Sequence, residues 1–203
     1  MIAVIDYGVG NLFSVEKALL KLGAEVTVTS DASQLRQADK IVLPGVGAFG
    51  DCMHNLQEAG LVPVVRDIAQ SAKPLLGICV GLQILFEGSE ESPGVAGLGI
   101  FKGMVQKIQA SGLKIPHMGW NSLSIASPRQ STDLFRQLPA APYVYFVHSY
   151  HAVPTDPAVI TAATEYGSVL TAAVAQGNVQ ATQFHPEKSG DVGLHILQNF
   201  LEG

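Results

Sequence analysis

One cysteine lies where a thiol could act as a nucleophile. Cys79 stands between Gly77 and Gly81 in G-I-C-V-G, where an apolar run meets a stretch with helical spacing. A nucleophile on a tight strand-to-helix turn needs small flanking residues, because larger ones would crowd the turn. Such a turn places the thiol at a helix amino terminus, which favours thiolate, and directs the Val80 N–H toward a developing oxyanion. The alternative for this motif alone is a buried cysteine in a glycine-rich turn.

A thiol nucleophile also needs a base and a group that orients the base. The stretch Q-F-H-P-E-K-S (183–189) supplies both, because His185 and Glu187 stand two residues apart at the end of a predicted strand. Residues i and i+2 of an extended chain point to the same side, and Pro186 stiffens the segment. Taken alone, H-P-E could be a solvated turn. Its occurrence together with G-I-C-V-G favours a catalytic triad.

A glycine-rich stretch, L-P-G-V-G-A-F-G-D (43–51), follows another apolar run. Its backbone N–H groups could complete an oxyanion hole. Loops that follow adjacent strands of an open α/β sheet gather at the carboxyl edge, so we expect this loop to meet Cys79. The stretch lacks G-K-[ST] and is not a P-loop, which leaves a plain connection or an anion-binding loop as alternatives.

The apolar pattern predicts the elements that position these stretches. In the first half, predicted strands (2–7, 25–30, 40–45 and 74–78) alternate with helical patterns (12–23, 61–72 and 80–88). Asn11 is a candidate cap and Gly23 a candidate stop for the first helix. Strands that alternate with helices indicate right-handed βαβ units and a parallel sheet.

The second half is mostly strand-like and ends in a helix. Strands are predicted within 99–108, 113–125, 143–153, 159–167, 168–176 and 179–186, with a hairpin turn at Gly177-Asn178 and a closing helix over about 190–201. We therefore expect an α/β fold in one domain, 1–203, with a central mostly parallel sheet flanked by helices and an antiparallel, strand-rich portion in the second half.

Composition excludes several classes of protein. The 203 residues are 47% hydrophobic, which fits one domain with a core. A net charge of -5 without a basic run argues against nucleic-acid binding. Two cysteines make no disulfide framework, and no metal-ligand spacing or cofactor motif is present. No charged leader and no apolar run of roughly 20 residues occur, so we expect a cytoplasmic protein that does not span a membrane.

The motifs P-G-V-G, G-I-C-V-G-L-Q and H-P-E, in this order, resemble those of class I (triad) glutamine amidotransferases over nearly the whole chain. The resemblance implies that Cys79, His185 and Glu187 hydrolyse the side-chain amide of glutamine through a γ-glutamyl thioester. It also implies further oxyanion donors at Val46 and Gly47. Substrate-binding residues would be Gly45, Gln83, Ser149 and Tyr150.

Three more stretches, 6–15, 116–121 and 145–154, are similar to family members that act in histidine biosynthesis. Those members are glutaminase subunits that form a heterodimer with a separate (β/α)8 cyclase subunit. Ammonia passes into the barrel, which shields it from protonation by water. The resemblance places these residues at the docking surface: Asn11, Trp120, Asn121, Tyr145 and Lys188. Lys188 directly follows Glu187 and could couple docking to the triad.

Other readings remain open at this point. One is a triad amidotransferase of pyridoxal phosphate or anthranilate synthesis, against which P-H-M-G-W-N and Y-F-V-H-S-Y-H-A-V argue. Another is a stand-alone cysteine hydrolase, and a third is a degenerate binding module. We interpret Cys52 as a packing residue and Glu90-Glu91 as a solvated loop. The role of His148 stays open, and the histidines without metal-ligand spacing are His54, His117, His151 and His195.

Overall fold

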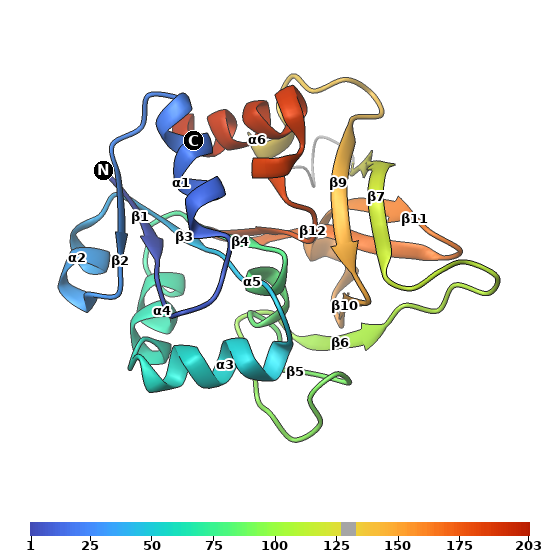
Figure 1. The fold of residues 1–203 in the computed structure, drawn as a ribbon, viewed down its shortest axis with the longest axis horizontal. Helices are drawn as coiled ribbons and strands as arrows, with labels where there is room; N and C mark the ends of the chain where they lie inside the picture. The colour runs from blue at the N-terminus through green and yellow to red at the C-terminus, as the bar shows by residue number, and fades with distance from the viewer. Residues whose placement is uncertain (127–132) are drawn as a thin grey trace.

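The computed structural model describes residues 1–126 and 133–203, and strands within them form a large eight-stranded sheet (Figure 1). The strand order is β2-β1-β3-β4-β13-β12-β11-β8. Their bounds are β1 Ile2–Ile5, β2 Val26–Thr29, β3 Lys40–Leu43, β4 Leu75–Ile78, β8 Ser124–Ile125, β11 Ile160–Glu165, β12 Val169–Gln176 and β13 Val179–Thr182.

Five of these strands form the predicted parallel portion. β2, β1, β3, β4 and β13 are mutually parallel, and Ile78 of β4 pairs with Thr182 of β13. The strands β1 and β4 are buried along their whole length. Continuous apolar runs are typical of parallel strands because helices cover both faces of the sheet.

Helices cover the sheet on two sides. Figure 1 shows α1 and α6 on one side of the sheet and α3 and α4 on the other. Their bounds are α1 Leu12–Lys21, α2 Ala32–Gln37, α3 Phe49–Glu58, α4 Val62–Ala69, α5 Val80–Gln83 and α6 Gly190–Glu202. The Asn11 side chain caps α1 as predicted, and Gly23 follows the helix with φ of +80°. The helix α2 was not predicted, and the Asp31 carboxylate caps it by accepting the Ser33 and Gln34 N–H groups.

The helix expected over 80–88 was wrong in length, because α5 ends at Gln83. The carbonyl groups beyond it bind a later loop instead of the next helical turn. The Ile84 carbonyl accepts the Leu98 N–H at 2.8 Å, and the Leu85 carbonyl accepts the N–H groups of Ile100 and Phe101 at 2.8 and 3.0 Å. Tertiary hydrogen bonds therefore replace the helical pattern that the sequence indicates.

The second half supplies the antiparallel portion. β11, β12 and β13 pair antiparallel, and Gly177-Asn178 joins β12 to β13 as predicted. The stretch expected as one strand over 143–153 divides at Ser149, since its two parts join different small sheets. One sheet pairs β7 (His117–Ser122) with β9 (Tyr143–His148), and the other contains β5 (Gly88–Ser89), β6 (Gly103–Lys107) and β10 (Tyr150–Pro154). Among the described residues, none of the helices has the length and apolar character needed to cross a bilayer.

Candidate active site

Three neighbouring strands end at the same edge of the sheet and place the candidate groups together. β4 lies between β3 and β13. Cys79 follows β4, the loop 44–47 follows β3, and the segment 183–189 follows β13. The Cys79 N–H donates to the Thr182 carbonyl at 2.8 Å, and the Val80 N–H donates to the Gly45 carbonyl at 3.2 Å. The predicted meeting of the glycine-rich loop with Cys79 is confirmed.

Cys79 occupies a strained turn between β4 and α5. Its φ is +56° and its ψ is -112°, a conformation that a side chain rarely adopts outside functional sites. The neighbouring glycines make this turn possible. A Cβ on Gly81 would lie 2.0 Å from the Leu43 carbonyl oxygen, and one on Gly45 would lie 2.5 Å from the Gly81 nitrogen. The expectation that a helix dipole favours the thiolate of Cys79 was wrong, because the four-residue α5 supplies too few aligned peptides.

His185 and Glu187 form a buried ion pair. His185 Nδ1 lies 2.8 Å from Glu187 Oε1, and their side chains are 2% and 1% exposed. We predicted this contact for an extended segment, in which residues 185 and 187 point to the same side. Glu187 instead lies in the 3-10 helix η3 (Pro186–Lys188). The backbone N–H of His185 donates to the Tyr145 carbonyl at 3.0 Å, and the Ser189 hydroxyl donates to the backbone carbonyl of His185 at 2.6 Å. These bonds hold the imidazole against its carboxylate.

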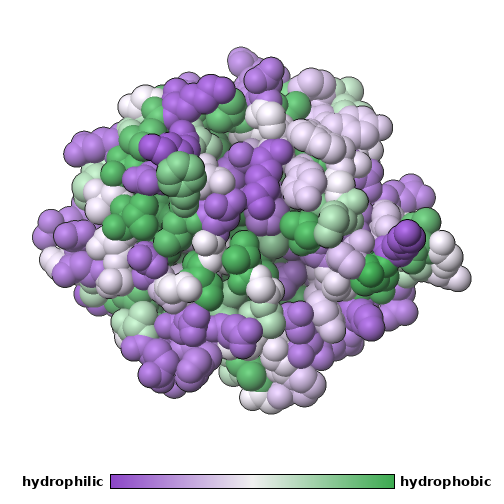
Figure 2. All heavy atoms as spheres, viewed as in Figure 1, coloured by the Kyte–Doolittle hydropathy of each residue, from purple (hydrophilic) through white to green (hydrophobic). Residues whose placement is uncertain are grey.

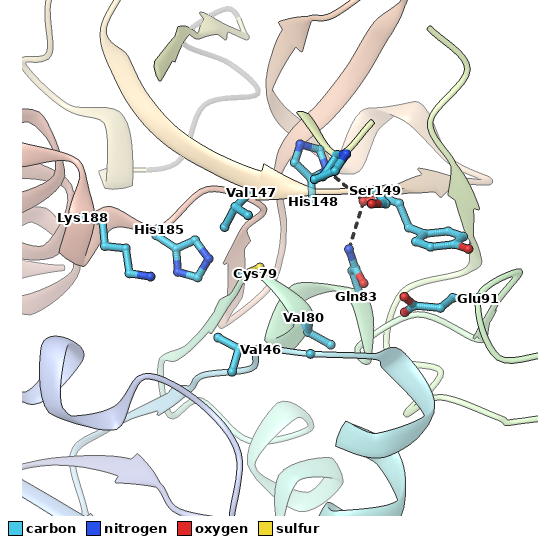
Figure 3. A pocket seen from close by; sticks show the side chains of 13 residues that line it. Val46, Cys79, Val80, Gln83, Glu91, Val147, His148, Ser149, His185 and Lys188 are labelled. Carbon is cyan, nitrogen blue, oxygen red and sulfur yellow. Dashed lines mark hydrogen bonds between the residues drawn. The ribbon is translucent and has the colours of Figure 1, made fainter. Parts of the chain in front are cut away.

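The environment of His185 favours the imidazolium form. Burial lowers the pKa of His185, but hydrogen bonds and charge attraction from Cys79 and Glu187 outweigh burial and raise it to about 9. With Nδ1 engaged by Glu187, Nε2 remains for the thiol, and Figure 3 shows the His185 ring beside Cys79. The arrangement can hold a thiolate–imidazolium pair and can return a proton to a leaving amine.

Three consecutive carbonyl groups fix the glycine-rich loop beside Cys79. The Tyr7 hydroxyl donates to the Pro44 carbonyl at 2.6 Å, and the Cys52 thiol donates to the Val46 carbonyl at 3.4 Å. The Gly45 carbonyl occupies the Val80 N–H, which is therefore not free to stabilise an oxyanion as expected. Cys52 thus does more than pack. Burial raises the pKa of its thiol to about 11, so it is no competing nucleophile.

A cavity of about 420 Å³ opens in front of Cys79 (Figure 3). Most of the residues that line it come from the three strand ends and from the junction of β9 with β10, and the full set is Val46, Gly47, Cys79, Val80, Gln83, Glu91, Pro116, Val147, His148, Ser149, Tyr150, His185 and Lys188. Its size is within the usual range for small-molecule sites. The predicted substrate residues Gln83, Ser149 and Tyr150 are among them, and Gly45 lies behind Val80 through the hydrogen bond described above.

Two residues of the site were missed in the sequence. Glu91 lines the cavity and accepts the Phe49 N–H at 2.8 Å, which corrects the interpretation of 90–91 as a plain solvated loop. Gln183 is fully buried, and its Nε2 lies 3.8 Å from Cys79 Sγ. Its position two residues before His185 on the same motif could have indicated its role.

Of the five residues expected at a docking surface, only Lys188 is in the lining of this cavity. Trp120 is 56% exposed and contacts Tyr145 edge to face, and Lys188 lines the cavity itself. Asn11 begins α1, beside the exposed Phe13. Asn121 is engaged within the chain, because its Nδ2 contacts His117 and the Glu165 carbonyl. On the face viewed in Figure 2, hydrophobic side chains are interspersed with hydrophilic ones.

Comparisons with known proteins agree with this geometry. The family model described as glutamine amidotransferase class-I matches residues 3–203. A protein of Moorella thermoacetica named imidazole glycerol phosphate synthase subunit HisH is 50% identical over 99% of this chain and 94% of its own length. The protein of the same name from Acaryochloris marina is 52% identical over 100% and 94%. A crystal structure described as glutamine amidotransferase superposes with a TM-score of 0.76 at 22% identity, over 100% of this chain and 98% of the other.

Proposed function

Because this chain belongs to the class-I glutamine amidotransferases, we propose that it is the glutaminase subunit of imidazole glycerol phosphate synthase. It hydrolyses glutamine to glutamate and ammonia, and the ammonia serves histidine biosynthesis in the cytoplasm. The observation that carries the proposal is the buried His185–Glu187 pair beside a strained Cys79, within a chain about half identical to proteins of that name. No cofactor enters the reaction.

The triad performs two successive acyl transfers. Cys79 Sγ attacks the amide carbon of glutamine, and the electron pair of the carbonyl moves to its oxygen. The C–N bond then breaks, and His185 Nε2 delivers the proton to the departing ammonia. Water then attacks the γ-glutamyl thioester while His185 takes its proton, the C–S bond breaks, and glutamate leaves with the thiolate–imidazolium pair restored. Glu187 holds the imidazole and stabilises its charge throughout.

The cavity orients glutamine by its charged end. The Glu91 carboxylate would receive the α-ammonium of glutamine, while its other contact, the Phe49 N–H, holds it in place. Gln83 uses its amide hydrogens on Tyr150 and Gln183, which leaves its carbonyl oxygen for the ligand. Ser149 lines the cavity beside Tyr150 and would contact the bound glutamine.

The oxyanion hole requires a change in the loop. The Gly45 carbonyl now occupies the Val80 N–H, so the peptide between Gly45 and Val46 must turn before Val80, Val46 and Gly47 can donate to an oxyanion. Two glycines flank Val46 and lower the steric barrier to that turn. We infer that the partner drives it, so the free subunit is nearly inactive.

The partner is a (β/α)8 cyclase subunit, with which this chain forms a heterodimer. Ammonia is mostly protonated in water at neutral pH and would be lost as a nucleophile, so it must pass directly into the barrel. There it reacts with a phosphoribulosyl-formimino aminoimidazole carboxamide ribotide, and the products are imidazole glycerol phosphate and aminoimidazole carboxamide ribotide. The exposed Trp120 is a suitable hot spot for docking, with Asn11, Asn121, Tyr145 and Lys188 around it. Lys188 joins this surface to the cavity.

The test is glutamate release from glutamine by the chain alone, with the cyclase barrel, and with the barrel and its ribotide ligand. We expect large stimulation only in the full mixture, and none with Cys79→Ala. High activity of the chain alone, unchanged by the barrel, would instead identify a stand-alone cysteine hydrolase. Activity retained by Cys79→Ala would contradict the triad.

A further inference from the structure

Two buried histidines beside the glutamine site have no part in the triad. His117 on β7 and His148 at the end of β9 pair across the two strands, and His117 Nδ1 lies 2.9 Å from His148 Nε2. Burial lowers the pKa of His117 to about 4 and that of His148 to about 3, so both rings are neutral near pH 7. A buried pair of neutral histidines must share one N–H at their contact.

The hydrogen bonds of this pair can run in only one direction. The Tyr150 carbonyl lies 2.9 Å from His148 Nδ1 and can only accept, so His148 Nδ1 carries the hydrogen. His148 Nε2 is then an acceptor, and His117 Nδ1 donates to it. His117 Nε2 must accept in turn, and the Asn121 amide donates to it at 3.2 Å. A single series of hydrogen bonds, all donated in the same direction, therefore leads from the Asn121 amide through His117 and His148 to the Tyr150 carbonyl.

The Tyr150 carbonyl also accepts a hydrogen bond from the side chains that surround Cys79. Gln83 Nε2 donates to the Tyr150 carbonyl at 3.0 Å and to Gln183 Oε1 at 3.1 Å, and Gln183 Nε2 lies 3.8 Å from Cys79 Sγ. Figure 3 shows His148 and Gln83 on opposite sides of the strand segment at Ser149, each joined to it by a dashed line. Both lone pairs of the Tyr150 carbonyl are thus engaged.

We propose that His117 and His148 are positioning residues of the glutamine site, because their directed hydrogen bonds hold the Tyr150 carbonyl, and with it the backbone of 149–150, against Gln83. The inference rests on the proposed function, in which glutamine binds beside Gln83, Ser149 and Tyr150. Asn121 is half-buried and adjoins Trp120, so the chain of hydrogen bonds begins at the docking surface and ends at the substrate.

A substitution of Asn121, where the series of hydrogen bonds begins, tests the direction of these bonds without changing a residue that lines the cavity. In Asn121→Asp the new carboxylate accepts only, so His117 Nε2 must carry the hydrogen. For neutral rings, every tautomer then reverses, and His148 Nδ1 faces the Tyr150 carbonyl with a bare lone pair. One added proton restores the hydrogen bond from His148 to the Tyr150 carbonyl, because an imidazolium at His117 donates from both nitrogens. The defect should therefore appear at high pH and disappear at low pH.

The groups that could also titrate near the pair are few. Tyr166 stacks on the His117 ring at 4.2 Å between centroids, and His151 and His185 are the other histidines whose charge reaches His148. These groups are the same in the variant and in its parent. The ratio of the two glutamine dissociation constants at each pH therefore isolates the effect of the substitution.

The measurement is calorimetric titration of glutamine into the full chain carrying Cys79→Ser, at pH 6 and pH 8.5. We expect Asn121→Asp to weaken binding about tenfold at pH 8.5, the effect of one lost hydrogen bond, and less than about threefold at pH 6. Asn121→Ala removes the same amide contacts but imposes no tautomer, so it should weaken binding less than about threefold at both pH values. Gln70→Glu, which adds the same charge at an exposed residue just after α4, should not change binding.

A second variant acts at the inner end. His148→Phe keeps the aromatic volume but removes the donor to Tyr150, and it should weaken glutamine binding about tenfold at both pH values. Equal dissociation constants for Asn121→Asp and its parent at both pH values would overturn the proposal, even if His148→Phe failed to fold. A parent chain that binds no glutamine at all would refute the proposed function and this inference with it.

Discussion

Replacing Glu187 by glutamine should disable the triad without changing its shape. Glu187 Oε1 accepts from His185 Nδ1 at 2.8 Å, and both side chains are almost completely buried. The amide is isosteric with the carboxylate but carries no charge. It can also present its NH2 group to Nδ1 and so select the wrong tautomer of the imidazole.

The magnitude follows from the pKa of His185. Its rise from 6.5 to about 9 corresponds to about 3 kcal/mol in favour of the imidazolium, at about 1.4 kcal/mol per unit. Cys79 and Glu187 share this preference against the opposing effect of burial. Removing the carboxylate charge should therefore cost on the order of 1 kcal/mol, or roughly five- to tenfold in the population of the thiolate–imidazolium pair. Selection of the wrong tautomer can extend the loss in kcat to about 10⁴-fold, as in serine triads.

The assay is partner-stimulated glutamate release between pH 6 and pH 10. Because His185 must be able to donate a proton to ammonia, wild-type activity should decline as pH rises through about 9. In Glu187→Gln the pKa of His185 falls, so the decline should begin about one pH unit lower. Alkylation of Cys79 by iodoacetamide at pH 7, measured in a Cys52→Ser background, should slow roughly five- to tenfold. An alkaline decline and an alkylation rate equal to wild type would refute the assigned role of Glu187.

Three other predictions follow from the geometry. Gly81→Ala places a Cβ 2.0 Å from the Leu43 carbonyl oxygen, so it should displace the turn at Cys79 and lower glutaminase activity at least about 100-fold; activity within threefold of wild type would contradict the close approach. Cys52 is fully buried with a thiol pKa of about 11, so mass spectrometry after native alkylation at pH 8 should find Cys79 modified and Cys52 unmodified, whereas equal modification would contradict its burial. Burial lowers the pKa of His117 and His148 below 6.5, so below that pH the unfolded chain binds protons that the folded one does not. The free energy of unfolding should therefore be highest above pH 6.5 and should decrease as pH falls toward 4. Urea unfolding at pH 7, 6 and 5 would measure this decrease, which should be smaller in His148→Phe.

The local sequence was sufficient for several features. The parallel strands could be predicted because their residues are apolar without interruption, as strands buried on both faces require. The turn at Cys79 could be predicted because two glycines flank the thiol in one short motif, with an apolar run before it and helical spacing after it. The pairing of His185 with Glu187 depends on two positions in one short motif. Such features involve neighbours along the chain.

Other features depend on contacts between distant segments. The early end of α5 reflects hydrogen bonds from a loop about fifteen residues later, which no periodicity reveals. Glu91 enters the cavity because its carboxylate binds the N–H of Phe49, the first residue of α3. The neutral pair of His117 and His148 exists because β7 and β9 place the two rings in contact, although 31 positions separate them in the chain.

The sequence alone therefore determined the chemical groups of this protein, its parallel core and the family that it resembles. The tertiary structure decided that β13 lies beside β4, which brings His185 to a thiol more than one hundred residues earlier in the chain. It also decided that the Gly45 carbonyl occupies the Val80 N–H. Residue types limit which hydrogen bonds a segment can make. The choice among them depends on which distant donors and acceptors the packed core brings within about 3 Å.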